Sequence, residues 1–169
     1  MPVGMQTSQP IGHYQFCIER PDECDVRSAS VEPVSLTEDR WAQLVYINNV
    51  VNEAITPTTD QEMFGVPELW VYPSLAGDCE DYVLLKRRLL AEQGWPLSAL
   101  LITVVIRPDG EGHAVLTVRT DRGDFVLDNL DPHVRLWSEA PYQFVKRQSE
   151  RHTGRWVEIA GGAIGFVGE

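Results

Sequence analysis

The apolar run Leu-Leu-Ile-Thr-Val-Val-Ile at residues 100–106 constrains the fold of this chain more than any other segment. A continuous run of this length is typical of a central β-strand. Residues 113–120 alternate between apolar and polar, and residues 125–130 follow an Asp-Arg-Gly-Asp turn, so both segments predict further strands. Weaker patterns predict two more strands, at residues 142–147 and 155–159.

A first helix is predicted ahead of these strands, over residues 37–54. Ser35-Leu36-Thr37-Glu38 fits a capping box, in which the serine and glutamate side chains bond free amides at a helix start. The apolar residues that recur at helical spacing are Trp41, Leu44, Val45, Val51 and Ile55. Ile55-Thr56-Pro57 ends the helix, because the residue before a proline resists helical geometry. Residues 58–76 are predicted to be a loop.

A second helix is predicted over residues 78–93. Asp78 is a suitable N-cap, and the cations of Lys86, Arg87 and Arg88 suit the later turns because they complement the helix dipole. Gly94 can supply the left-handed residue that stops the helix. Helices first and meandering strands second is an α+β pattern, in which helices lie on one side of an antiparallel sheet.

The 169 residues are predicted to form one domain with a core that needs no disulfide or metal. Residues 1–34 are predicted as an extended N-terminal arm, residues 35–159 as the folded domain, and the Gly-rich residues 160–169 as a mobile tail. The net charge is −11, and the 14 Lys and Arg are scattered. Nucleic acid and anionic membranes are therefore disfavoured as partners. No apolar run approaches the ~20 residues of a membrane span.

Two of the three cysteines, Cys17 and Cys24, lie seven residues apart. This spacing can close a small disulfide, which would imply an oxidising compartment; the alternative is two free thiols in a cytosolic protein. The chain begins Met-Pro-Val-Gly-Met, without a basic start or an apolar leader core, so we expect a cytosolic protein or a mature exported form. If the pair closes, Cys79 is the odd thiol.

Cys79 opens the second predicted helix, within Gly77-Asp78-Cys79-Glu80-Asp81-Tyr82. A helix start stabilises negative charge and therefore favours the thiolate, which is the nucleophilic form. A lone buried cysteine is more often an inert hydrophobe, but the flanking acids argue against deep apolar burial here. We therefore predict that Cys79 is a reactive thiol.

His113 and Asp128 are the predicted partners of this thiol. His113 follows a Gly-Glu-Gly turn and begins a strand, from which it can reach a helix terminus packed on the sheet. Taken alone, such a histidine is more often a polar residue that caps the strand. Asp128 lies in an otherwise apolar segment, where an unpaired carboxylate is costly and His113 is its natural partner.

The register between these two strands decides whether the partners meet. Any loop of even length places both side chains on the same face of the sheet, because side chains alternate along a strand. A loop centred between Thr120 and Asp121 sets His113 directly opposite Asp128, whereas an Arg122-Gly123 turn offsets them by four residues. The sequence leaves both registers open.

Three acids crowd the thiol: Asp78, Glu80 and Asp81. Nearby carboxylates disfavour a further negative charge, so they raise the pKa of the thiol. A bound hard cation would offset them, and a ligand set of oxygen atoms suits Ca²⁺. The alternative is ordinary stabilisation of a helix start by acidic side chains. A calcium site at these three residues is one of two open interpretations.

Four elements together resemble the bacterial transglutaminase-like cysteine peptidases: Trp70, the Gly-Asp-Cys-Glu-Asp-Tyr element at 77–82, Gly112-His113-Ala114-Val115-Leu116 and Val126-Leu127-Asp128-Asn129. The resemblance covers roughly residues 36–157. It implies a papain-like fold of the transglutaminase type. It also implies that Cys79 is the nucleophile, that His113 acts as general base and then acid, and that Asp128 orients the histidine.

The resemblance further implies a calcium ion held beside the cysteine by Asp78, Glu80 and Asp81, and a role for an upstream tryptophan, for which Trp70 is the nearest candidate. The implied activity is cleavage of a protein substrate, such as a cell-surface protein, in the periplasm, although the family's export leader is absent from this sequence. Two other functions stay open. One is acyl transfer to an amine by the same triad, and the other is a catalytically silent domain that binds a peptide or calcium.

Overall fold

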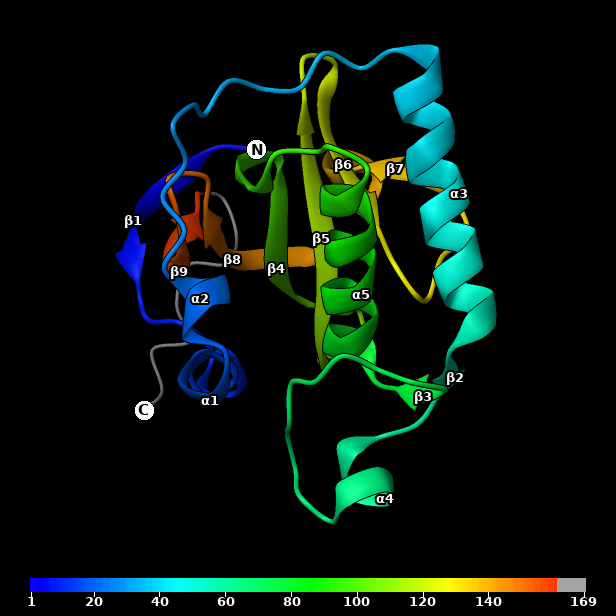
Figure 1. Cartoon of the computed structure of the whole chain (residues 1–169). Helices are drawn as coiled ribbons and strands as arrows, with labels where there is room; N and C mark the ends of the chain where they lie inside the picture. Colours follow the sequence, from blue (N-terminus) through cyan, green and yellow to red (C-terminus); the bar gives the residue numbers. More distant parts are fainter. Residues whose placement is uncertain (161–169) are drawn as a thin grey trace.

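A seven-stranded sheet forms the centre of the structure, a computed structural model that describes residues 1–160 (Figure 1). In spatial order its strands are β1 (Val3–Thr7), β9 (His152–Ile159), β8 (Gln143–Ser149), β4 (Leu100–Ile106), β5 (Gly112–Thr120), β6 (Gly123–Leu127) and β7 (Arg135–Leu136). All neighbouring strands in it are antiparallel. The predicted central strand, β4, has three strands on each side, and its side chains are almost all buried.

The five α-helices of the described chain lie within residues 11–92, before β4. They are α1 (Ile11–Glu19), α2 (Pro21–Cys24), α3 (Glu38–Ala54), α4 (Asp60–Phe64) and α5 (Cys79–Glu92), with short 3₁₀ turns at Leu97–Ala99 and Trp137–Glu139. A parallel pair, β2 (Thr56–Pro57) and β3 (Ala76–Gly77), precedes α5. α5 packs on β4 and β5, and α3 packs on α5 (Figure 1). This architecture confirms the predicted α+β class and both predicted long helices. Among the described residues, no helix has the length and apolar character that a membrane crossing requires.

Residues 1–34 are not the extended arm that their composition predicted. They form β1 at one edge of the sheet and the two short helices α1 and α2, which a disulfide between Cys17 and Cys24 joins. Residues 11–19 show no helical period because α1 leaves Ile11 and Ile18 exposed, so the helix depends on tertiary packing rather than on an amphipathic face. Residues 161–169, nearly all of the predicted mobile tail, lie outside the described residues.

His13 is the buried centre of this N-terminal unit. Its side chain is 1% exposed, and its ring lies edge-on to Trp70 and Trp156, with centroids 5.5 and 5.3 Å away. The indole N–H of Trp156 donates a hydrogen bond to Nδ1 of His13 at 3.2 Å. Burial lowers the pKa of His13 from 6.5 to about 4, and the positive charge of Arg87 makes a smaller contribution to this lowering.

Acid is therefore expected to destabilise the fold through His13. Because the pKa is lower in the folded state, the unfolded chain binds more protons as the pH falls from 6.5 to 4. The free energy of unfolding should fall across this window by roughly 3 kcal/mol. Urea titrations at several pH values measure the effect, and His13→Gln should remove it, whereas replacement of the exposed His133 should not. Equal acid sensitivity of the His13 variant and the wild type would contradict this account.

The ends of the helices depart from the predicted caps. α3 is capped by Thr37, whose Oγ1 accepts from the amide of Arg40 at 3.2 Å, so the predicted capping box with Ser35 is wrong. A complete capping box instead joins Thr59 and Glu62 at the start of α4, inside the segment predicted to be loop. That helix has only five residues, too few to give a helical period in the sequence.

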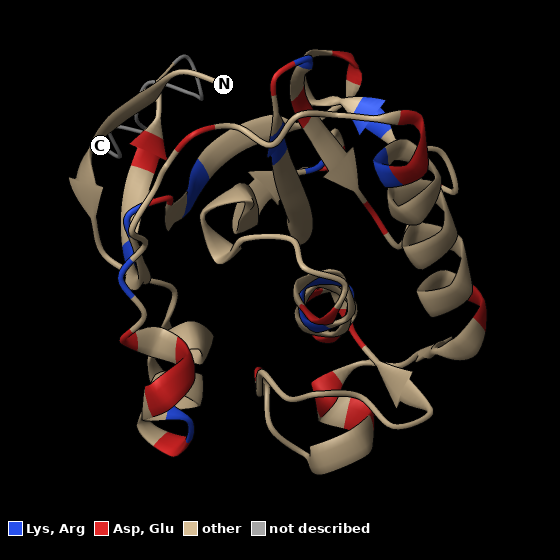
Figure 2. Cartoon of the chain, turned by 45° about the horizontal axis from the view of Figure 1, so that its top comes forward, with Lys and Arg blue, Asp and Glu red and all other residues tan. Residues whose placement is uncertain are grey.

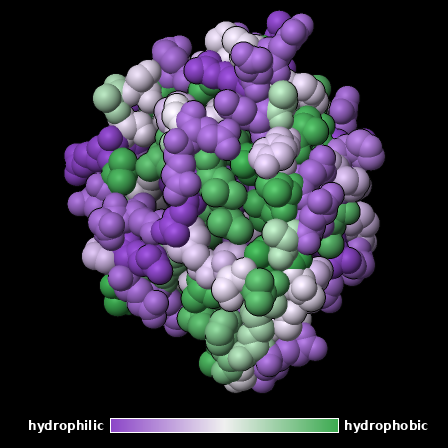
Figure 3. Space-filling view, turned by 45° about the vertical axis from the view of Figure 1, so that its right-hand side comes forward, coloured by the Kyte–Doolittle hydropathy of each residue, from purple (hydrophilic) through white to green (hydrophobic). Residues whose placement is uncertain are grey.

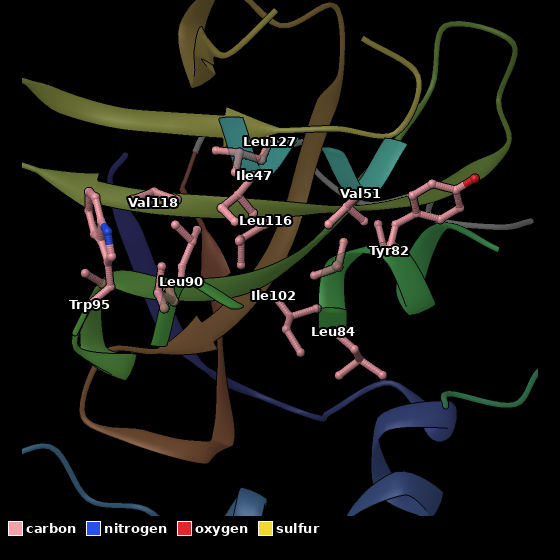
Figure 4. Packing of buried hydrophobic residues seen from close by; sticks show 14 of the residues in the cluster. Ile47, Val51, Tyr82, Leu84, Leu90, Trp95, Ile102, Leu116, Val118 and Leu127 are labelled. Atoms are coloured by element: carbon pink, nitrogen blue, oxygen red, sulfur yellow. The ribbon is translucent and has the colours of Figure 1, made fainter. Parts of the chain in front are cut away.

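The main core lies between α3, α5 and the sheet (Figure 4). Leu44, Ile47 and Val51 form the buried face of α3. Trp41, which the helical spacing assigned to this face, is 37% exposed and lies edge-on to Phe125, with ring centroids 5.2 Å apart. The side of the molecule that carries α3 also keeps apolar side chains at its surface (Figure 3).

Two of the three cations expected to complement the dipole of α5 are buried instead. Lys86 is 0% exposed and Arg87 is 6% exposed. Nε of Arg87 donates to the backbone carbonyl of Leu100 at 3.0 Å, while the guanidinium of Arg88 stacks on the ring of Tyr72. The reason is that the sheet covers α5 on one side and α3 covers it on another, which leaves this helix little solvent-facing surface.

Candidate active site

Cys79 is the first residue of α5, as the sequence predicted, and Asp78 occupies the N-cap position. Asp78 makes no side-chain capping bond, so its predicted capping role is not fulfilled. The Cys79 thiol donates to Oε2 of Glu80 at 2.9 Å. The thiol is thus partnered by one of the acids beside it.

The surroundings of Cys79 oppose thiolate formation in this state. Burial raises the pKa of the thiol well above its ordinary value, and the charge and hydrogen bond of Glu80 raise it further. The backbone amide of Ala114, on β5, acts in the opposite direction by hydrogen bonding to the sulfur. An active nucleophile at this position therefore needs a base for the proton and relief from the neighbouring negative charge.

His113 and Asp128 form a buried pair on the sheet. Nε2 of His113 lies 2.8 Å from Oδ1 of Asp128, and the two residues are 7% and 3% exposed. Pairing of Leu116 with Leu127 across β5 and β6 offsets His113 and Asp128 by two residues. The offset lies between the two registers that the sequence allowed, because the connecting turn is Asp121-Arg122, and both side chains share one face, as predicted.

Further donors hold the carboxylate of Asp128. Its Oδ1 accepts from the amide of Leu130 at 3.0 Å, and its Oδ2 accepts from the hydroxyl of Tyr142. The ring of Tyr142 also lies edge-on to His113, with centroids 5.6 Å apart. Burial opposes the charge of Asp128, but the bonds from His113, Tyr142 and Leu130 outweigh it and hold the pKa below its ordinary value. Asp128 is therefore an ionised carboxylate at neutral pH.

Cys79 and His113 line the same cavity, whose volume is about 600 Å³. Trp70, which is 4% exposed, is part of the same lining. One side of the cavity comes from the start of α1, through Pro10 and Ile11. The hydrogen bond to Asp128 occupies Nε2 of His113, which leaves Nδ1 as the ring nitrogen available for another partner.

Three carboxylates gather next to the thiol: Asp60, Asp78 and Glu80 each place an oxygen within 4.8 Å of the others. Asp60 comes from the first turn of α4, inside the segment that the sequence predicted to be loop, and was not among the predicted ligands. Figure 2 shows acidic residues where the start of α5 meets α4, while Lys and Arg are spread over separate elements. Within residues 1–160, none of these three acids forms an ion pair.

The three acids lack a counter-charge. The pKa of Asp78 is raised to about 9, mainly by burial and to a smaller extent by the negative charges of Glu80, Asp81 and Asp60. Burial also raises the pKa of Glu80. Buried oxygens of Asp60 and Asp78 have no hydrogen-bond partner in the described part of the chain. Unpartnered carboxylate oxygens without nitrogen or sulfur donors are the ligand set that Ca²⁺ prefers, so these residues fit a calcium ion.

Asp81 stands apart from this cluster. Its Oδ1 accepts from the backbone amide of Val71 at 2.9 Å, which ties the loop before β3 to α5. Gly77 makes room for it, since a Cβ there would lie 2.8 Å from the Asp81 side chain. The structure therefore groups Asp78 and Glu80 with Asp60, and not with Asp81.

Two site residues gave little indication in the sequence. Asp60 follows Thr59 in a Thr-Asp-Gln-Glu capping pattern, so a helix start with an acid in its first turn could have been found there. Tyr142 lies just before β8, and only the folded sheet brings its hydroxyl to Asp128.

A cysteine at a helix start, packed against an antiparallel sheet that carries a paired histidine and aspartate, is an arrangement typical of cysteine proteases and related acyl-transfer enzymes. The family model described as bacterial transglutaminase-like cysteine proteinase matches residues 3–163, and the chain belongs to this family. A comparison with curated proteins gives no match.

Solved structures of Legionella pneumophila LapG share the fold. The calcium-bound form is 23% identical, with a TM-score of 0.60, over 73% of this chain and 74% of that chain. The EGTA-treated form is also 23% identical, with a TM-score of 0.58, over 74% of this chain and 70% of that chain. At this identity the likeness shows the fold, and the roles of individual residues rest on the geometry above.

Proposed function

We propose that this protease is an endopeptidase in which Cys79 is the nucleophile, His113 the general base and then acid, and Asp128 the residue that orients His113. The observation that carries the proposal is the buried His113–Asp128 pair, whose imidazole lines the same cavity as the Cys79 sulfur. A nucleophile, a base and a group that orients the base are what covalent acyl transfer requires.

In the proposed mechanism, Nδ1 of His113 takes the thiol proton, because Nε2 is bonded to Asp128. The sulfur attacks the carbonyl carbon of the scissile amide, and the oxyanion accepts from the backbone amide of Cys79 at the helix start, where no intrahelical carbonyl is available. The imidazolium returns its proton to the departing amine, which leaves a thioester. Water, deprotonated by His113, then hydrolyses the thioester and restores the thiol.

Calcium binding beside the thiol is the second part of the proposal, with Asp60, Asp78 and Glu80 as ligands. The unpartnered oxygens of Asp60 and Asp78 support it, as does the closeness of Glu80 to both. Asp81, which the sequence motif suggested, remains a candidate through its second, unpartnered oxygen. A bound cation would supply the positive charge that offsets these acids next to the nucleophile.

Calcium is expected to stabilise the protein, with Asp60 as one of its ligands. At about 100 times Kd, an ion that binds only the folded state adds about 2.7 kcal/mol, or roughly 5–10 °C in melting temperature for a chain of this size. Asp60→Asn should reduce the shift, while the exposed Asp22→Asn should keep it. Melting curves in calcium and in EGTA measure this. A wild-type melting temperature that is the same in both would remove calcium from the proposal.

The proposed location is the periplasm, with a cell-surface protein as substrate. The disulfide between Cys17 and Cys24 supports an oxidising compartment, because the cytosol keeps thiols reduced. The peptidase family supports a protein substrate.

The peptidase proposal is tested with a proteome-derived peptide library and a fluorescent primary amine. An endopeptidase releases new peptide N-termini and leaves the amine free, whereas a transglutaminase-type enzyme attaches the amine to peptides. A silent binding domain does neither. Only the first outcome supports the proposal, and sequencing of the new termini would define the cleavage site.

A further inference from the structure

Lys86 is a fully buried cation that the mechanism above does not use. It is one of only two lysines in the sequence and is 0% exposed, on the second turn of α5 after Cys79. Its Nζ donates to Oδ1 of Asn48 at 2.8 Å and lies 5.9 Å from the ring centroid of Tyr82. Burying an ammonium that has few hydrogen-bond partners costs free energy, so the position of Lys86 needs a physical explanation.

The partners of Lys86 lead to the segment that carries Asp128. Asn48 is 0% exposed, and its Nδ2 donates to the backbone carbonyls of Asp131 and Pro132 at 3.1 and 3.3 Å. One helical turn later on α3, Nδ2 of Asn52 donates to the backbone carbonyl of Asp128 at 2.8 Å. Two amides of one helix therefore hold the backbone of residues 128–132, and Lys86 fixes the orientation of the first amide.

Within residues 1–160, the groups that act on Lys86 come from α3, α5 and the segment after β6. α3 presents the neutral amides of Asn48 and Asn52, and α5 itself contributes Tyr82. The segment after β6 carries Asp128, which is bonded to His113, and Asp131, whose carboxylate bonds Arg135 instead. Burial lowers the pKa of Lys86 to about 7, and the negative charge of Asp128 acts against this lowering. Asp128 is thus the acid whose negative charge favours the ammonium of Lys86, although its direct ion-pair partner in the described chain is His113.

We propose that Lys86 is a positioning residue for Asp128: through Asn48 it holds residues 128–132 on the helix that carries Cys79, and its charge balances the Asp128 carboxylate. Its catalytic consequence rests on the proposed function, whereas its coupling to Asp128 does not. This arrangement joins α5, which carries Cys79, to the segment that carries Asp128. The positions of Cys79 and Asp128 relative to each other are therefore kept constant.

The coupling is tested first by NMR on protein labelled with ¹³C in lysine, which gives two side-chain signals to follow against pH. The Lys86 signal should titrate near pH 7, and Asp128→Asn should lower its midpoint by at least about half a unit, because the carboxylate that favours the ammonium is gone. The Lys146 signal is the internal reference. An unchanged Lys86 midpoint in the folded Asp128→Asn protein would overturn the proposal, whatever the protein cleaves.

The catalytic consequence is tested with Lys86→Met, which keeps an unbranched side chain one atom shorter than lysine and removes its charge. We expect kcat to fall by about tenfold or more with little change in KM, and the acid limb of the kcat/KM profile to move to higher pH. The shift is expected because a nearby positive charge lowers the pKa of every group around it. Arg88→Met, on the same helix, is the matched control and should leave the pH dependence of kcat/KM unchanged. An unchanged acid limb and unchanged kcat in Lys86→Met would refute the positioning role.

Discussion

Replacing Cys79 by alanine is expected to abolish peptide cleavage, lowering kcat/KM by about 10⁴-fold or more. The sequence has three cysteines, and two of them form the disulfide, so no other thiol can replace this nucleophile. The variant should fold normally, because it removes one partly exposed sulfur atom and shortens no core residue. Release of peptide N-termini by wild type and variant, measured at equal concentrations of folded protein, gives the ratio.

The thiol itself provides an independent readout. A peptide-derived electrophile should label the wild type once, at Cys79, and should not label the alanine variant. Labelling that requires a native fold would distinguish a nucleophile in a built site from a merely accessible thiol. Full proteolytic activity in a folded Cys79→Ala protein would place catalysis elsewhere and leave this site as a binding domain.

Replacing Asp128 by asparagine is expected to lower kcat by about 10³–10⁴-fold with a small effect on KM. The asparagine can still bond His113, but it carries no charge to stabilise the imidazolium, and its amide can favour the wrong tautomer. The pKa of Asp128 lies below its ordinary value, so the carboxylate is ionised throughout pH 5–8 and the loss should be nearly constant across that range. Steady-state kinetics at several pH values measure this.

The matched control is Asp109→Asn, which changes an exposed acid that pairs with Arg107 in the hairpin between β4 and β5. It should behave as wild type. If Asp128→Asn lost activity only in proportion to a loss of folded protein, Asp128 would be a structural residue and not part of the proposed triad.

The sequence predicted those elements whose pattern repeats over several residues. The run at residues 100–106 could only be buried, and it became β4 at the middle of the sheet. The spacing of apolar residues before Pro57 gave α3, although its cap and the exposure of Trp41 differed from the prediction. The elements α1, α2 and α4 are too short to show such a repeating pattern. Two of them, α1 and α2, also depend on contacts with distant segments, through the rings around His13 and the packing of α2 on β9.

The buried cations show the same limit. Lys86 and Arg87 follow acids on α5 in an order typical of an exposed helix, yet both are inside the protein. Their burial depends on acceptors supplied by other elements, Asn48 on α3 and the backbone of Leu100. Nothing in the local sequence around residue 86 contains this information.

The sequence by itself determined the chemistry that is available: a thiol that begins a helix, acids on either side of it, and a histidine and an aspartate on consecutive strands. These depend on residue type and on helix and strand periodicity, which are local. Only the tertiary structure decided which groups meet. The hydrogen bond of His113 to Asp128, the approach of Asp60 to Asp78 and Glu80, and the hydrogen bond of Tyr142 to Asp128 join residues that are 14 or more positions apart. Such contacts are set by strand register and by packing of α3, α4 and α5, which no single segment specifies.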